Sequence, residues 1–135
     1  MKVTKEGDYG LRAVILLASI DGRLASASEI SRQQNIPQKF LARIMPKLVR
    51  KGVIISTPGS KGGYRLSRRS DQITFLEVLE AIEGPILLNH CLGESCECLH
   101  EHLCSMKNIW KNAQVKLMDY FGSITMNQLG ERTVQ

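Results

Sequence analysis

Apolar residues recur along the chain with helical spacing, and turn-forming residues separate the helical stretches. The first stretch covers residues 4–20, where the apolar positions between Leu11 and Ala18 run almost all the way round a helix. A helix that is apolar on nearly every side is buried in a protein core. We therefore expect this segment to be the central helix and to end at Asp21-Gly22.

Two shorter helices joined by a tight turn are predicted next. Ser26 and Glu29 have the S-x-x-E spacing of a capping box, in which each side chain binds a free backbone N–H, and this marks a helix over residues 27–34. A second helix is expected from Pro37, which suits a first helical turn, to Gly52, which suits a helix end. Two helices with so short a connection are typical of a helix-turn-helix.

A β-hairpin is predicted directly after these helices. Residues 53–57 are apolar and β-branched, residues 58–63 have the composition of a turn, and residues 64–67 suit a second strand. A helix-turn-helix followed by a hairpin is a winged helix, whose second helix enters the major groove of DNA by its N-terminal end. A plain helical pair beside a surface hairpin is the alternative, and the order of the elements favours the winged helix.

The outward positions of the second helix supply candidate DNA contacts. Gln38 and Arg43 can read base edges with paired hydrogen bonds, and Lys39 can contact a base or a phosphate. Lys61 stands at the tip of the predicted wing, where it could meet a phosphate or the minor groove. These four residues are the predicted DNA-binding residues.

Two more helices are predicted beyond the hairpin. Thr74 and Glu77 form a second capping box, which starts a helix that Gly84-Pro85 ends. A long helix begins near Ser105, and a short helix is expected in the tail. A second copy of the chain is predicted to cover the apolar stripe of the long helix, because the earlier helices already build a core; folding back on its own domain is the alternative. The stripe consists of Met106, Ile109, Trp110, Ala113, Leu117, Tyr120 and Phe121.

These elements predict a mainly α-helical fold with a small β-hairpin wing. A winged helix-turn-helix DNA-binding domain is expected over residues 1–85, a cysteine-rich segment over residues 86–104, and a dimerisation helix with a C-terminal tail over residues 105–135. The chain of 135 residues is long enough for one such domain with an appendage.

Charge divides the chain near the end of the predicted wing. Residues 1–70 hold 14 Lys and Arg against 4 Asp and Glu, whereas residues 71–135 hold 4 against 9, within an overall net charge of +5. A solvated basic surface is one interpretation of the first half. The position of the positive charge around the helix-turn-helix favours double-stranded DNA as the partner.

Composition and motifs argue against several classes of protein. The first apolar run, AVILLASI, has 8 residues, whereas a membrane helix needs about 20, and no secretory signal stands at the start. A cytoplasmic protein without membrane contact is therefore expected. The sequence shows no Ser/His/Asp arrangement and no phosphate-binding loop, so an enzyme is not expected.

All four cysteines lie within residues 91–104, in the stretch CLGESCECLHEHLC. Clustered cysteines in the cytosol indicate metal or redox chemistry, since disulfides rarely persist there. Their C-x4-C-x-C-x5-C spacing lacks two separate C-x2-4-C knuckles, so zinc is disfavoured, whereas soft thiolates suit an iron–sulfur cluster. Redox-active thiols without a metal are another possibility. His90, His100 and His102 are candidate ligands, with surface residues as the alternative interpretation.

The ordered set of these motifs resembles the Rrf-type winged-helix transcription regulators. The similar stretches are MKVTKEGDYGLRAVILLA, IPQKFLARIMPKLVRKGVI, GSKGGYRL and ITFLEVLEAIEGPI, and the resemblance covers about residues 1–125. That family includes IscR, NsrR, RirA and CymR, and the chain looks most like the members that bind an iron–sulfur cluster. The resemblance implies a homodimeric transcription factor, expected to act as a repressor, that binds an operator in double-stranded DNA.

The resemblance also implies a ligand set. Cluster-binding members have a C-x5-7-C-x5-C pattern, which Cys91, Cys98 and Cys104 match with gaps of six and five residues, leaving Cys96 as an extra cysteine. The implied cofactor is an iron–sulfur cluster, either 2Fe-2S or 4Fe-4S. IscR-like members take a histidine three residues after the last cysteine, where this chain has Lys107. NsrR-like members take an aspartate of the partner subunit near the start of the first helix.

Asp8 stands at the place of that aspartate, so Asp8 from the partner subunit and Cys96 are the main candidates for the fourth ligand, and a histidine or a small molecule could also complete the site. A carboxylate in a first helical turn is also favoured by the helix dipole, which gives Asp8 a second interpretation as a surface residue. The wing also departs from the family. Pro58 stands where relatives carry an arginine before the first wing glycine, with Lys61 as its expected replacement. Within the DNA-reading helix, Pro46 removes a backbone bond.

Three hypotheses follow from the sequence. The first is a transcription regulator whose operator binding is controlled by the cluster, in response to cluster supply, iron, nitric oxide or redox state. The second is a thiol-based regulator of the same fold that binds no metal and acts through a regulatory protein partner, as CymR-like members do. The third is a zinc-stabilised DNA-binding protein.

Overall fold

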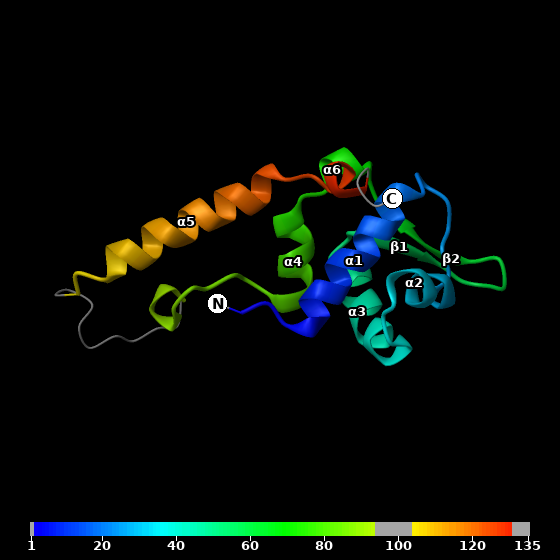
Figure 1. The fold of residues 1–135 in the computed structure, drawn as a ribbon, viewed down its shortest axis with the longest axis horizontal. Coiled ribbons are helices and arrows are strands. Elements are labelled where there is room, and N and C mark those ends of the chain that lie inside the picture. The colour runs from blue at the N-terminus through cyan, green and yellow to red at the C-terminus, as the bar shows by residue number, and fades with distance from the viewer. Residues whose placement is uncertain (1, 94–103, 131–135) are drawn as a thin grey trace.

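The computed structural model describes residues 2–93 and 104–130, and its fold is mainly helical with an antiparallel hairpin, as expected. Figure 1 shows that most elements form one body, from which α5 extends as an arm. The short 3-10 turns η1 and η2 were not predicted. In chain order the elements are α1 (Lys5–Ser19), α2 (Ala27–Gln34), α3 (Gln38–Arg50), β1 (Ile54–Thr57), β2 (Gly63–Leu66), η1 (Ser70–Gln72), α4 (Phe75–Glu83), η2 (His90–Leu92), α5 (Lys107–Ser123) and α6 (Met126–Gly130).

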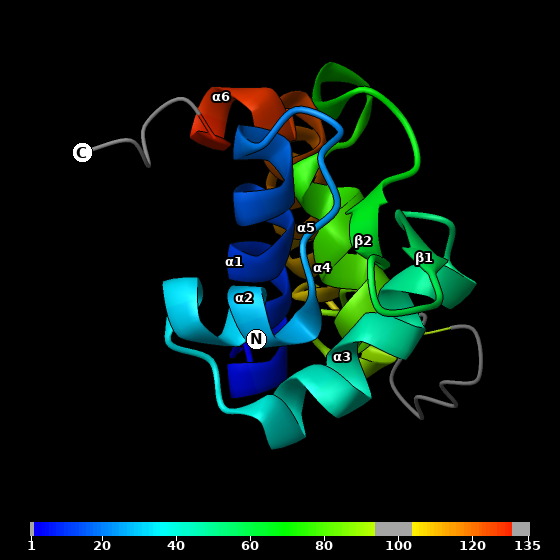
Figure 2. The same cartoon turned by 90° about the vertical axis from the view of Figure 1, so that its right-hand side faces the viewer.

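The central helix of the body is α1, as its apolar sequence predicted. Leu11, Val14 and Leu17 are buried, and α1 contacts α2, α3, α4, α6 and β2. The side chain of Thr4 caps its start by accepting a hydrogen bond from the N–H of Gly7. In Figure 2, α1 stands upright with α6 at its upper end and α3 across its lower end. The tail of the chain and the helix-turn-helix are therefore joined through α1.

The helices α2 and α3 form the predicted helix-turn-helix. The turn between them places Asn35 in the left-handed region, with φ 53°, a conformation that asparagine adopts more readily than most residues. The Ser31 hydroxyl closes the turn by donating a hydrogen bond to the carbonyl of Ile36 at 2.6 Å. Leu41 and Ile44 of α3 are buried, so the opposite face of α3 lies at the surface.

The wing, β1 and β2, follows α3 directly. Its strands pair antiparallel with Ile54 opposite Leu66, and Ala25 adds an isolated bridge to Tyr64 from the segment before α2. Gly63 lies where these backbones meet. Its φ is 154°, and a Cβ at this position would lie 2.6 Å from the carbonyl oxygen of Ala25. The backbone before α2 therefore ties the wing to the body.

Of the two hydrogen bonds that each predicted capping box should contain, the structure forms one. The side chains of Ser26 and Thr74 accept hydrogen bonds from the N–H groups of Glu29 and Glu77, as expected. The reciprocal bonds, in which each carboxylate would accept a hydrogen bond from the N–H of Ser26 or Thr74, are not found among the described residues, so that part of the prediction was wrong. Both carboxylates pair with arginines instead, because a charged donor binds a carboxylate more strongly than a neutral N–H does.

Acid is expected to remove the stabilising effect of the Arg23–Glu29 pair. The hydrogen bond from Arg23 holds the pKa of Glu29 below its ordinary value in the folded protein. A carboxyl group with a lowered folded-state pKa stabilises the fold above its unfolded-state pKa, and this stabilisation is lost as the pH falls through the folded-state value. Urea unfolding at neutral pH and below about pH 4 should therefore show a smaller acid-induced loss of stability for Glu29→Gln than for the unchanged protein. Equal losses in the two proteins would contradict the prediction.

The chain returns to the body after α5. The N–H of Phe75 donates to the carbonyl of Ile124 at 2.8 Å, and the N–H of Met126 donates to the carbonyl of Ile73 at 2.9 Å. Met126 is 0% exposed and belongs to the main core. The short tail helix that the sequence predicted is α6, and it packs on α1 and η1.

The apolar stripe of α5 is exposed over most of its length. No residue of α5 is buried, and Ile109 and Tyr120 are 67% and 62% exposed. Leu117 and Phe121 pack against the core at the C-terminal end of α5. The body therefore covers the C-terminal end of the stripe and leaves the rest of it exposed. Within the described ranges, α5 and the other helices all lack the combination of length and apolar character that crossing a bilayer requires.

Candidate functional site

The outward face of α3 carries the DNA-contact candidates that the sequence predicted. Gln38, Lys39 and Arg43 are exposed, as is Ala42 between them, while the opposite face of α3 is buried in the core. Figure 2 shows α3 along one edge of the body with the wing beside it. The two elements can therefore approach the same partner surface, and contact with DNA stays a prediction for these residues.

The helix α3 continues through Pro46. Proline has no N–H, so the carbonyl of Ala42 loses its usual helical partner. Both residues are exposed, which allows water to replace the missing bond. The helix therefore presents its whole length as one surface. Cations spaced three or four residues apart follow it as a row: Lys39, Arg43, Lys47 and Arg50.

An aromatic ring supports two cations of this row. The ring of Phe40 packs edge-on against Tyr9 of α1, with the ring centroids 5.1 Å apart. Lys39 Nζ lies 5.6 Å and Arg43 Cζ lies 5.7 Å from the centroid of the Phe40 ring. Cations at such distances from an aromatic ring are attracted by its quadrupole. Phe40 therefore helps to hold the two predicted DNA-reading cations in place.

A carboxylate of α1 also contacts the cationic row. Glu6 Oε2 lies 3.0 Å from Lys47 Nζ, and Glu6 Oε1 lies 3.4 Å from Arg43 Nη1. The hydrogen bond from Lys47, with a smaller effect from Arg43, holds the pKa of Glu6 below its ordinary value. The contacts join residues 41 and 37 positions apart, and no sequence pattern signals a contact at such separation. Glu6 was accordingly not among the predicted residues.

The tip of the wing exposes Lys61, as predicted. Gly62 beside it has no room for a side chain, because a Cβ would collide with the carbonyl oxygen of Thr57. Gly59 adds a positive φ of 107° to the same turn, a conformation that glycine adopts without strain. Lys61 is thus presented on a tightly folded backbone.

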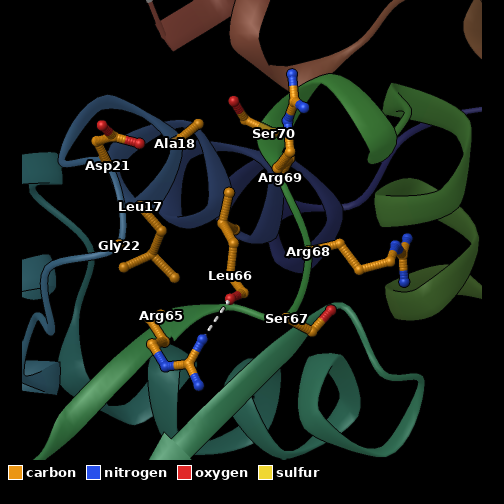
Figure 3. A pocket seen from close by; sticks show the side chains of 10 residues that line it. All are labelled: Leu17, Ala18, Asp21, Gly22, Arg65, Leu66, Ser67, Arg68, Arg69 and Ser70. Atoms are coloured by element: carbon orange, nitrogen blue, oxygen red, sulfur yellow. Dashed lines mark hydrogen bonds between the residues drawn. The ribbon is translucent and has the colours of Figure 1, made fainter.

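A pocket of about 300 Å³ lies between α1 and the segment from β2 to η1 (Figure 3). Arg65, Arg68 and Arg69 line it, but Figure 3 shows that their guanidinium groups point in different directions. Arg68 pairs with Glu77 of α4, and Arg69 pairs with Asp71 at 2.6 Å. Because the three guanidinium groups point away from one another, this pocket is not arranged to bind an anion.

Two of the four cysteines lie in the described part of the chain. Cys91 lies in η2 and Cys104 lies shortly before α5, and both are half-buried free thiols. His90 beside Cys91 is exposed. Thiolates are the donors that iron–sulfur clusters use, so the chemistry of these two residues fits such a group. The other candidate ligands lie outside the described residues: Cys96, Cys98, His100 and His102.

Asp8 lies in the first turn of α1, where it is exposed and pairs with Arg12 at 3.1 Å. A pair with this i, i+4 spacing stabilises a helix modestly. Across residues 2–93 and 104–130, the structure gathers no group of three or more His, Cys, Asp or Glu that could hold a metal. A ligand role for Asp8 as a residue of the partner subunit, which the resemblance implied, stays a prediction.

The segment that carries Cys91 is attached to α5. The N–H of Leu88 donates a hydrogen bond to Gln114 Oε1 of α5 at 3.0 Å. A cavity of about 600 Å³ lies between this segment, the end of α4 and α5. A change around Cys91 can therefore reach α5 through direct contacts.

Comparison with known proteins identifies relatives of the whole chain. Residues 3–132 match the Rrf2 family, described as iron-dependent transcriptional regulators. A protein of Haemophilus influenzae named as an HTH-type transcriptional regulator is 30% identical over 130 residues, which cover 96% of this chain and 86% of the relative. CymR (YrzC), described as the global cysteine regulator of B. subtilis, is 26% identical with a TM-score of 0.82, covering 98% of both chains. The oxidized form of Staphylococcus aureus CymR is 25% identical with a TM-score of 0.77, covering 100% of both chains.

These matches include the helix-turn-helix, the wing and α5 together. They confirm the winged-helix fold and a regulator rather than an enzyme. The chain belongs to the Rrf2 family of transcriptional regulators.

Proposed function

We propose that this regulator binds an operator in double-stranded DNA as a homodimer and acts as a repressor. The observation that carries the proposal is the exposed face of α3, where Gln38, Lys39 and Arg43 stand clear of the core beside a wing with Lys61 at its tip. Arginine and glutamine suit base edges, and lysine suits bases and phosphates. The name of the Haemophilus relative, an HTH-type regulator, also supports DNA binding.

The exposed stripe of α5 is the proposed contact between the two subunits. Met106, Ile109 and Tyr120 are each more than half exposed, and a contiguous apolar surface of this kind marks an interaction site. A two-fold pair of α5 helices would present two α3 helices to the two half-sites of a palindromic operator.

We further propose that an iron–sulfur cluster controls this binding. Cys91, Cys98 and Cys104 are the proposed ligands, with Asp8 of the partner subunit or Cys96 as the fourth. Such a group supplies sensitivity to iron supply, nitric oxide and redox state when it is bound. The description of the family as iron-dependent supports this proposal, as does the suitability of thiolate donors.

The contacts around Cys91 give this control a physical route. Cys91 lies in the segment that Leu88 ties to Gln114 of α5, and Cys104 lies shortly before α5 begins. Ligation of both thiols would hold the two ends of residues 91–104 in fixed places and thereby restrain α5. Because α5 is the proposed dimer contact, its placement sets how the two α3 helices face DNA, which is a two-state element that ligation can bias.

The likeness to the CymR structures favours a second candidate, a thiol-based regulator of the same fold that holds no metal. One of these relatives is described as a global cysteine regulator, and the other was solved in an oxidized form. Cys91 and Cys104 are free thiols that are not fully buried, so oxidants can reach them. Oxidation of the thiols would then replace cluster loss as the change that reaches α5.

Anaerobic purification followed by analysis of iron, sulfide and zinc tests the two candidates. A coloured protein that contains iron and sulfide is expected, and Cys91→Ser and Cys104→Ser should lose both the colour and the iron. A colourless protein with four alkylatable thiols would instead support the thiol-based candidate. A zinc-loaded protein would overturn both.

Control by the cluster predicts that operator affinity differs between cluster-loaded and cluster-free protein. Both forms must be compared at one salt concentration, because phosphate contacts make affinity strongly dependent on salt. Equal affinities would remove the cluster from the mechanism while leaving DNA binding intact. An Asp8→Ala variant with an unchanged spectrum would exclude Asp8 as a ligand and leave Cys96, a histidine or a small molecule.

A further inference from the structure

We infer that Glu6 is an internal competitor of DNA phosphate for the cations of α3, and that it lowers the affinity of the protein for DNA of any sequence. The inference rests on the proposed role of α3 in DNA binding. The contacts of Glu6 allow two roles, a competitor that occupies the cations and a scaffold that positions them. The surroundings of α3 favour the competitor.

The carboxylate of Glu6 occupies two members of the cationic row at once. Its Oε2 lies 3.0 Å from Lys47 Nζ, and its Oε1 lies 3.4 Å from Arg43 Nη1. Lysine and arginine use these same nitrogen atoms to bind phosphate oxygens, and a carboxylate offers the same kind of anionic acceptor. A phosphate that binds either nitrogen must therefore compete with Glu6.

Arg43 does not depend on Glu6 to stay in place. Its side chain is 63% exposed, and its guanidinium lies against the ring of Phe40, which itself packs on α1. The helices α1 and α3 are in contact, since a Cβ at Gly10 of α1 would lie 3.4 Å from Ile44 of α3. Packing of this kind fixes the position of α3, whereas exposed ion pairs add little to it.

Glu6 itself is held at the start of α1. Thr4 caps this helix, and the Glu83 carboxylate at the end of α4 accepts hydrogen bonds from both the N–H and the hydroxyl of Thr4, each at 2.6 Å. The helix dipole also favours a carboxylate in the first turn. The protein therefore keeps a negative charge at a fixed place beside the cationic row, where it repels phosphate as well as competing with it.

The variant Glu6→Gln distinguishes a competitor from a scaffold, because the two roles predict changes of opposite sign. The probe is a fluorescein-labelled random-sequence duplex, and binding is measured by fluorescence anisotropy between about 50 and 200 mM salt. A competitor predicts that the variant binds about threefold to tenfold more tightly at the low-salt end, with a steeper dependence on salt, because more cations are then free to displace counterions. Its thermal unfolding midpoint should stay equal or fall slightly, since ion pairs have been lost.

A matched control is available in Asp71→Asn. This change also raises the net charge by one and frees an arginine, because Asp71 pairs with Arg69 at 2.6 Å. It lies in η1, which packs with α6, and α6 and α3 lie at opposite ends of α1 in Figure 2. Its effect on affinity should stay below about twofold, since salt screens charges that are far apart.

A double replacement of the cations gives a further check. In an Arg43→Ala, Lys47→Ala background, Glu6→Gln should change the affinity no more than the control does. Weaker binding by Glu6→Gln alone, in a variant that melts like the unchanged protein, would show a scaffold, and unchanged binding would show neither role; either result would overturn the inference. Failure of the proposed function looks different, because neither the unchanged protein nor any variant would then bind the duplex.

Discussion

A monomeric protein is the expected result of replacing Ile109 with glutamate, and its affinity for a palindromic operator should fall about a hundredfold or more. Ile109 is 67% exposed within the apolar stripe of α5, so the change costs the isolated subunit little. In a dimer, the new carboxylate would be buried without a partner, which strongly disfavours association. A lone subunit offers one α3 helix to one half-site and loses the gain in affinity that two linked sites provide.

Asn112→Glu is the matched control for this change. It introduces the same negative charge on the same helix, but Asn112 is an exposed polar residue outside the apolar stripe. Sedimentation velocity should show a monomer for Ile109→Glu and a dimer for Asn112→Glu, with the affinities for the operator following the same order. An Ile109→Glu protein that stays dimeric would remove α5 as the subunit contact.

Loss of about 2 to 5 kcal/mol in the free energy of unfolding is expected when Met126 is replaced by alanine. Met126 is 0% exposed and lies in the main core, although it belongs to the tail of the chain. Removing its side chain leaves a cavity that the surrounding helices cannot fill without moving. The loss should also loosen α5 from the body, because Met126 and its backbone bond to Ile73 hold the segment that follows α5.

Urea unfolding measures this effect, and Gln128→Ala is the control on the same helix. Gln128 is exposed, so its replacement should change the free energy of unfolding by less than about 0.5 kcal/mol. Comparable losses in the two variants would mean that α6 is not docked in the core as described.

Much of the fold could be predicted because its signals are local. The caps at Ser26 and Thr74, the turn glycines and the periodic apolar residues place α1 to α4 and the wing within a residue or two. The docking of the tail could not be predicted, because it depends on backbone pairing between Ile73 and Met126. These residues are far apart in sequence, and neither stands in a stretch long enough to show a periodic pattern.

The candidate site divides in the same way. Periodicity alone placed Lys39 and Arg43 on the exposed face of α3, since the buried positions of a helix determine the others. The contact of Glu6 with Lys47 follows from how α1 crosses α3, which no spacing within either helix reveals. The ligand set that includes Cys98 came from the resemblance to a family, because spacing allowed several metals and several sets.

The attachment of the C-terminal end of α5 to the body makes the position of its N-terminal end sensitive to the tilt of the helix. Backbone bonds and Met126 fix its C-terminal end to the body, while its N-terminal half projects away in Figure 1. With 17 residues, the helix is about 25 Å long, so a tilt of about 10° at the fixed end moves the other end by about 4 Å. Half-sites one turn of DNA apart are separated by about 34 Å. In the proposed dimer, the angle at which the tail holds α5 would therefore set the spacing between half-sites that the two α3 helices can span.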